Sequence, residues 1–346
     1  MDNKVTLRDI AREAHLSVSA VSLVLNNQPC RISPENKIRI RNIAKARNYS
    51  ANQVARSLVT KKTHTLGLIL PDIENMFFSS LAKNLEENCR RAGYVLIITN
   101  SNDSCKNDSE LVRMLTARGV DGLFLIVSNE SYRTGTKLLD EIRSLPIPYM
   151  MLDRVFPEFP CDQVLFDNEA GAYKAVRHLL ENGHRKIACI GDSEYSDNCR
   201  RRVNGYLKAM EEYDCEVRPE YIIKGDFHIQ SGYCAGEKFL KTDATAVFVC
   251  NDMMSLGLLK RFREEGVRVP RDYSLVSYDN TLTFFLTDPE ITSVEQNISK
   301  LGNCAFSLML DRLNGKTGDP VRHVLMPELI RKGSVSRLQS EVRKAE

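Results

Sequence analysis

The sequence predicts a small all-α helix-turn-helix unit followed by two α/β lobes with doubly wound parallel sheets. One observation is charge: the first 62 residues hold twelve Lys and Arg against four Asp and Glu, whereas the rest of the chain is mildly acidic. The other is periodicity, because short helical repeats before residue 50 give way after residue 65 to apolar runs that alternate with helices. A small basic module joined to a larger acidic one is expected when one end of a chain docks on a polyanion.

Three short helices account for the basic module, over residues 7–14, 18–25 and 34 to about 48. A hydroxyl residue that can cap the helix precedes each of them, namely Thr6, Ser17 and Ser33. The turn between the first two helices is only three to four residues long, which is typical of a helix-turn-helix. Charge and periodicity alone also fit a small helical bundle with a solvated basic face.

Residue-level patterns favour the helix-turn-helix over the small helical bundle. Val5 to Ala11, Leu16 to Asn27 and Asn48 to Leu58 resemble, in order and spacing, the headpiece of the LacI/GalR family of bacterial repressors. The resemblance implies a DNA-binding transcription regulator that acts as a homodimer on a pseudo-palindromic operator in double-stranded DNA. It divides the chain into a headpiece (1–50), a hinge helix with a linker (51–64) and an effector-binding and dimerisation domain (65–340).

The same resemblance implies which residues contact DNA. Leu58 would be an apolar wedge in the minor groove, although an ordinary packing leucine is the structural alternative. Leu23 stands where family members commonly have a base-reading Arg, and it could touch a thymine methyl instead, which leaves the operator sequence open. The implied DNA contacts are Thr6, Ser17, Val18, Ser19, Ser22, Leu23, Asn26 and Arg31 in the headpiece, and Asn52, Ala55 and Leu58 in the hinge.

The remainder alternates between strands and helices. Helices are predicted over 77–92 and 106–118, and apolar strands over 65–70, 94–99, 122–127, 147–152, 186–190, 246–250 and 274–278. Strands that are apolar on both faces and separated by helices indicate parallel sheets, and about 280 residues exceed one such sheet, so two lobes are expected. The resemblance extends here to the periplasmic-binding-protein-like fold. It places the N-lobe at about 65–161 and 290–320 and the C-lobe at about 162–289 and 321–340.

Polar and aromatic residues follow successive strand ends, where ligands of open α/β sheets bind. Each alone has a structural explanation: Phe77 and Phe78 as core, Asp153 with Arg154 as an exposed ion pair, Asn251 as a helix cap. Together, carboxylates, amides, Arg and aromatic faces suit a sugar. By resemblance the pocket comprises Asn75, Phe77, Phe78, Asp153, Arg154, Arg202, Phe227, Asn251, Asp279 and Gln296. Ribose or another pentose is the favoured effector, with a purine or a sugar phosphate as the alternative.

Other classes of protein find little support in the sequence. There is no Gly-x-Gly-x-x-Gly, no Gly-x-Ser-x-Gly and no complete phosphate loop, so neither an enzyme nor a bound cofactor is expected. The ten cysteines form no Cys-x-x-Cys pair and the histidines show no ligand spacing, so no metal site is expected. Met1 leads into a polar helix without a signal-length apolar stretch, which predicts a cytoplasmic protein without a membrane span. A sugar-binding module without a regulatory role remains an alternative.

Overall fold

The computed structural model of the protein describes residues 5–26, 29–49, 62–192, 194, 196–284 and 287–338. The chain forms two compact units, Met1–Thr63 and His64–Glu346. The hinge residues Asn52, Ala55 and Leu58 lie outside the described residues. None of the described helices combines the length and the apolar character needed to cross a membrane.

The smaller unit consists of the helices α1 (Leu7–Ala14), α2 (Val18–Leu25) and α3 (Pro34–Ala46). The three predicted caps are present, because Thr6 forms a capping box with Asp9 and the side chains of Ser17 and Ser33 accept hydrogen bonds from backbone N–H groups. The helices bury one small core, which comprises Ile10, Ala11, Ala14, Val21, Val24, Ile40 and Ala44. Helix α3 ends at Ala46, two residues before the predicted end.

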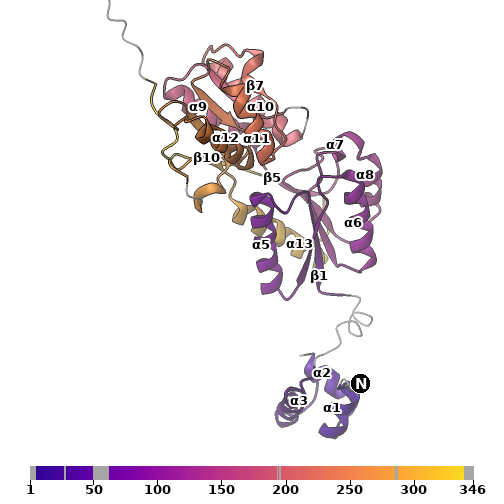
Figure 1. Ribbon diagram of the computed structural model, residues 1–346. Coiled ribbons are helices and arrows are strands. Elements are labelled where there is room, and N and C mark those ends of the chain that lie inside the picture. Colours follow the sequence, from indigo (N-terminus) through magenta and orange to yellow (C-terminus); the bar gives the residue numbers. More distant parts are fainter. Residues whose placement is uncertain are drawn as a thin grey trace, which may run out of the picture. The chain divides into compact units, whose positions relative to one another are not determined.

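The larger unit contains two six-stranded sheets (Figure 1). The N-lobe sheet has the order β11-β5-β4-β3-β1-β2 and is parallel throughout. Its strands are β1 (Thr65–Leu70), β2 (Val95–Asn100), β3 (Gly122–Leu125), β4 (Tyr149–Leu152), β5 (Asp162–Phe166) and β11 (Arg322–Leu325). One apolar cluster lies under a pair of helices, α5 (Met76–Arg91) and α13 (Ile298–Leu313). A second cluster lies under another pair, α6 (Cys105–Ala117) and α8 (Thr136–Arg143). The short helix α7 (Ser131–Thr134) precedes α8.

The C-lobe sheet has the order β12-β10-β9-β8-β6-β7, and only its β10–β12 pair is antiparallel among the described strands. Its strands are β6 (Ile187–Ile190), β7 (Ile222–Ile223), β8 (Ala246–Val249), β9 (Ser274–Asp279), β10 (Thr292–Glu295) and β12 (Glu328–Ile330). Helices α9 (Asn168–Glu181) and α10 (Asp197–Glu212) pack as one pair and α11 (Ile229–Phe239) and α12 (Asp252–Glu264) as another; the 3₁₀ turns are η1 (Pro219–Tyr221) and η2 (Leu282–Phe284).

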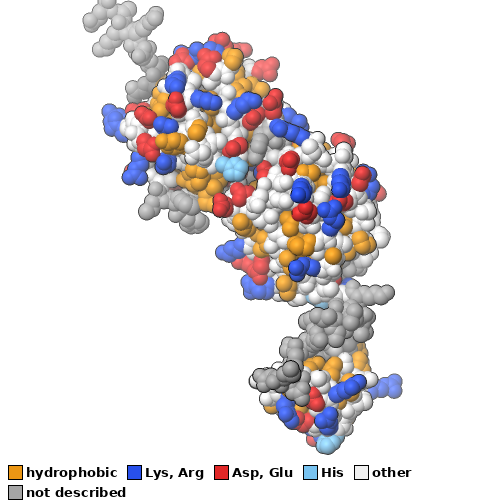
Figure 2. Space-filling view, turned by 45° about the vertical axis from the view of Figure 1, so that its right-hand side comes forward, with side chains coloured by type: hydrophobic (Ala, Val, Ile, Leu, Met, Phe, Trp, Pro, Cys, Tyr) orange, Lys and Arg blue, Asp and Glu red, His pale blue; other side chains and the backbone are white. Residues whose placement is uncertain are grey.

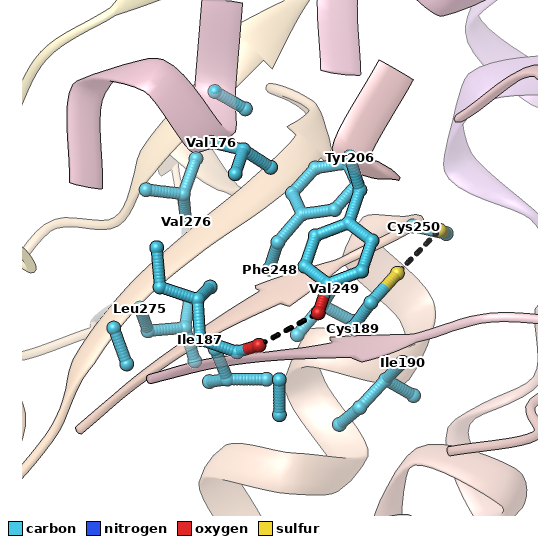
Figure 3. Packing of buried hydrophobic residues seen from close by; sticks show 14 of the residues in the cluster. Val176, Ile187, Cys189, Ile190, Tyr206, Phe248, Val249, Cys250, Leu275 and Val276 are labelled. Carbon is cyan, nitrogen blue, oxygen red and sulfur yellow. Dashed lines mark hydrogen bonds between the residues drawn. The ribbon is translucent and has the colours of Figure 1, made fainter. Parts of the chain in front are cut away.

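The C-lobe core lies around its central strands (Figure 3). The hydroxyl of Tyr206, on α10, donates to the carbonyl of Ile187 at 2.9 Å, so the one polar atom of this buried ring is satisfied. The thiols of Cys189 and Cys250 lie 3.9 Å apart in the same core. All ten cysteines are free thiols.

The lobe boundaries need correction at all three crossings. β5 and β11 were expected in the C-lobe but belong to the N-lobe sheet, and β10 was expected in the N-lobe but pairs with β9 in the C-lobe. The chain therefore changes lobe just after β5, β10 and β11, a few residues later than predicted at each point. Which sheet a strand joins depends on pairing with residues far away in sequence, such as Thr292 with Val276.

Candidate functional site

One cavity between the lobes is lined by all ten residues predicted for the effector pocket, together with Asn198. We call this the interlobe cavity. In this conformation its volume is about 20 Å³. That is room for about one water molecule, whereas ligand pockets usually enclose several hundred Å³.

Strand ends position several of its lining side chains. Asp153 follows β4, Asp279 ends β9, and Phe227 comes a few residues after β7. All three have left-handed backbone, with φ of 57°, 102° and 70°. Such backbone is uncommon for residues other than glycine and clusters at binding sites, where the surrounding structure holds it in place.

The helices supply the other lining residues. Asn75 caps α5, and its Oδ1 accepts a hydrogen bond from the Phe77 N–H at 3.0 Å. In the turn that follows, the rings of Phe77 and Phe78 lie edge to face, with their centroids 5.4 Å apart. Asn251 caps α12 while its Nδ2 donates to the Phe227 carbonyl at 3.0 Å. The predicted cap at Asn251 is therefore present, and the same residue also lines the interlobe cavity.

Two buried guanidinium groups line the cavity and donate hydrogen bonds to residues around it. Arg202, on α10, donates from Nε to Asn168 Oδ1 at 2.7 Å and from Nη1 to the Cys250 carbonyl, and its Nη1 lies 3.4 Å from Asp279 Oδ1. Arg154 donates to Asp103 Oδ1 at 2.8 Å and lies over the Phe78 ring. The structural alternative of an exposed ion pair between Asp153 and Arg154 is therefore wrong, because both residues are buried and Arg154 pairs with the half-buried Asp103, 51 positions earlier.

Two acceptor atoms of the cavity residues, Asp153 Oδ1 and Gln296 Oε1, are buried and have no hydrogen-bond partner among the described residues. The other oxygen of Asp153 accepts from Asn198 Nδ2 at 3.1 Å, and Gln296 Nε2 donates to Asp279 Oδ1 at 2.8 Å. Burial raises the pKa of Asp153 against the opposing effect of both arginines, and it raises the pKa of Asp279 to about 7. A buried acceptor without a partner is costly, so the cavity is chemically prepared for a hydrogen-bond donor.

Sequence reasoning missed Asn198. It lies on α10, four residues before Arg202, so the two side chains share one face of the helix. That spacing was a usable signal once Arg202 had been assigned to the pocket. Asn198 also joins the lobes, because it belongs to the C-lobe and bonds the N-lobe residue Asp153.

The second candidate site is the outer face of α2 in the smaller unit. Val21 and Val24 point into the core, whereas the side chains of Val18 and Leu23 are 42% and 40% exposed. Asn26 is half-buried and its Nδ2 donates to the Ser22 carbonyl at 2.8 Å, so it closes the end of the helix. Of the other predicted headpiece contacts, Thr6, Ser17, Ser19 and Arg31 are exposed and Ser22 is half-buried.

The surface of the larger unit differs from that of a polyanion-binding module. On its visible face, acidic and basic side chains are interspersed (Figure 2). The described residues contain no group of three or more His, Cys, Asp and Glu side chains that could hold a metal ion.

Comparison with known proteins agrees with this arrangement. A model of bacterial regulatory proteins of the lacI family matches residues 6–52, and a periplasmic binding protein-like domain matches residues 176–335. The HTH-type transcriptional repressor PurR of Vibrio vulnificus is 30% identical over 340 residues, which cover 96% of this chain and 99% of the relative.

Two solved structures are similar over most of the chain. A LacI family transcriptional regulator from Enterococcus faecium with bound ribose is 29% identical, with a TM-score of 0.72 over 80% of this chain and 100% of that one. The lac repressor dimer bound to operator has a TM-score of 0.85 over 96% of this chain and 100% of that one; at 24% identity this likeness concerns the fold.

Proposed function

The chain belongs to the LacI family of bacterial regulatory proteins, and from this premise we propose that it is a transcriptional repressor whose affinity for operator DNA is set by a small neutral sugar in the interlobe cavity. In this proposal a homodimer presents two headpieces to the half-sites of a pseudo-palindromic operator. A pentose such as ribose is the favoured sugar, since a similar LacI family regulator from Enterococcus faecium was solved with bound ribose.

The outer face of α2 supports the DNA-binding role. The helix contains no acidic residue, so it can enter a major groove without repelling phosphates. Its exposed side chains are small hydroxyl or apolar groups, which suit base edges and thymine methyls. Phosphate contacts from the basic headpiece would supply most of the affinity, which should therefore fall steeply with salt concentration.

The observation that carries the sugar assignment is the pair of unsatisfied acceptors, Asp153 Oδ1 and Gln296 Oε1. Sugar hydroxyls donate to such oxygens and also accept from the arginines and amides nearby. The rings of Phe77, Phe78 and Phe227 offer apolar faces to the C–H groups of a sugar.

The small volume of the interlobe cavity supports an allosteric role. A sugar cannot enter about 20 Å³, so the lobes must separate or the lining side chains must move. The 3.1 Å bond from Asn198 to Asp153 crosses between the lobes and would be exchanged for bonds to the ligand. A ligand that prefers one lobe arrangement shifts the population toward it, and this shift would alter how the two headpieces of a dimer reach DNA.

A thermal-shift screen of the full chain against pentoses, hexoses, sugar phosphates and purines tests the ligand class. An effector at about 100 times its dissociation constant adds about 2.7 kcal/mol to the native state. Asp153→Asn should abolish the response, whereas Asp140→Asn, a matched change at an exposed position on α8, should not. A response only to purines, or one that survives Asp153→Asn, would contradict the sugar assignment. The active ligand is then added to an operator-binding assay on DNA selected from a random library.

A further inference from the structure

A second hollow adjoins the interlobe cavity. Its volume is about 610 Å³, and residues from both lobes line it: the first turns of α5 and α13 from the N-lobe, and the segment that follows β9 from the C-lobe. We call it the outer hollow. It is large enough for a sugar ring, unlike the interlobe cavity in this conformation.

The two spaces have two lining residues in common. Asp279 and Gln296 line both the interlobe cavity and the outer hollow. Gln296 is only 2% exposed, and its Oε1 has no hydrogen-bond partner within the described part of the chain. A ligand that donates to Gln296 from the interlobe cavity therefore has the outer hollow directly beside it.

The lining chemistry of the outer hollow indicates a hydroxylated, uncharged occupant. Five of its lining residues carry hydroxyl groups, namely Ser79, Ser80, Thr281, Thr283 and Ser299. Met76 and Ile298 add apolar surface. Hydroxyl groups mixed with apolar patches are what the polar and C–H faces of a sugar ring require.

The charges disfavour a phosphate in this position. The ionisable residues that line the outer hollow within the described ranges are Asp279 and Glu295, both acidic. Lys332 lies two residues after β12, and its Nζ already donates to Asn280 Oδ1 at 3.2 Å and Thr283 Oγ1 at 3.1 Å. A phosphoryl group there would face two carboxyl groups and at most one lysine.

The crevice of about 450 Å³ lined by Asp72, Glu74, Asp103 and Glu130 offers a less suitable extension. It shares no lining residue with the interlobe cavity. Three of these four carboxylates already accept hydrogen bonds: Asp72 from the Glu74 N–H at 2.9 Å, Glu130 from the Cys105 N–H at 2.8 Å, and Asp103 from Arg154 at 2.8 Å. Of these two hollows, it is the outer hollow that shares lining residues with the interlobe cavity.

We propose that the outer hollow is a second sugar subsite, so that the effector is a neutral disaccharide or glycoside with one ring in the interlobe cavity and the next in the outer hollow. This inference rests on the proposed function and narrows its ligand class. It differs from the pentose expectation in the size of the ligand and excludes sugar phosphates.

The test compares each monosaccharide with a disaccharide that contains it, by thermal shift of the full chain. The probes are xylose with xylobiose, glucose with cellobiose and maltose, galactose with lactose, and ribose 5-phosphate and glucose 6-phosphate as anionic ligands. Ser299→Phe places a ring in the outer hollow from the start of α13. Ser307→Phe, at an exposed serine two turns along the same helix, is the matched control, and Ser80→Phe blocks the hollow independently from α5.

We expect one disaccharide to act at about a tenfold lower concentration than its monosaccharide. Both blocking variants should remove this advantage and keep the monosaccharide response, while Ser307→Phe changes neither. A disaccharide advantage that survives both blocking variants would overturn the subsite. A monosaccharide response without any disaccharide advantage, or a preference for a sugar phosphate, would overturn the subsite but leave a regulator that responds to a small ligand. A screen without any response would count against the sugar proposal itself.

Discussion

Replacing Arg202 by methionine removes a cation from the buried wall of the interlobe cavity while it keeps an unbranched side chain. Arg202 and Asp279 are 4% and 6% exposed, so water cannot take the place of the guanidinium. The change deprives Asn168 Oδ1 and the Cys250 carbonyl of their donor and leaves Asp279 without its nearest cation. Removal of one partner from a buried ion pair costs about 3 to 5 kcal/mol, because the other charge stays buried.

The loss of stability caused by Arg202→Met should depend on pH. Burial raises the pKa of Asp279 to about 7, and the loss of Arg202 raises it further, because Arg202 favours the carboxylate. An acid whose folded-state pKa lies above its unfolded value stabilises the fold at low pH, and this contribution is lost as pH rises through the folded pKa. Arg202→Met should therefore be more destabilising, relative to the unmodified protein, at about pH 8 than at about pH 6.

Urea unfolding followed by circular dichroism measures the effect, since the chain has no Trp to report by fluorescence. Arg200→Met is the matched control, because Arg200 lies on the same helix but is exposed, and its partner Asp197 keeps a second cation, Arg201, at 2.7 Å. We expect the control variant to lower the free energy of unfolding by at most about 1 kcal/mol. The double variant Arg202→Met with Asp279→Asn should recover part of the loss. A loss below about 1 kcal/mol for Arg202→Met, or an equal loss at both pH values, would refute the reasoning.

Three further outcomes are expected. Ile10→Ala should lower the stability of the headpiece by about 2 to 5 kcal/mol, because Ile10 is fully buried. This variant should therefore lose DNA binding but keep the thermal shift given by an effector. The control Val18→Ala, at an exposed position, should leave headpiece stability unchanged, as measured by circular dichroism. Burial lowers the pKa of His184, so the folded protein loses stability as pH falls below about 6.5. The melting temperature of His184→Asn should therefore fall less on acidification than that of the unmodified protein. Equal falls in melting temperature would contradict this. Leu58→Ala should abolish specific operator binding but keep effector binding, and an unchanged mobility shift would rule out the wedge assignment.

Much of the fold follows from local patterns. The caps at Thr6, Ser17 and Ser33 act within three residues of themselves, so their hydrogen bonds could be predicted from spacing. Parallel strands present their carboxyl ends at one edge of a sheet, and this geometry places Asp153 at that edge of the N-lobe sheet and Asp279 at that edge of the C-lobe sheet once the strands are recognised. The family resemblance then selected which residues at those ends line the interlobe cavity.

The tertiary structure alone decided the features that depend on distant partners. The lobe to which β5, β10 and β11 belong is set by strand pairing across long stretches of chain, and local periodicity does not encode it. In the same way Arg154 bonds Asp103 rather than its neighbour in sequence. The orphaned acceptors of Asp153 and Gln296, the small interlobe cavity and the outer hollow beside it arise only from the packing of both lobes, because each is a property of the space between segments that the sequence keeps far apart. The sequence by itself thus determined the elements, their caps and the class of protein, whereas packing decided the volumes and the lining charges of the spaces between the lobes.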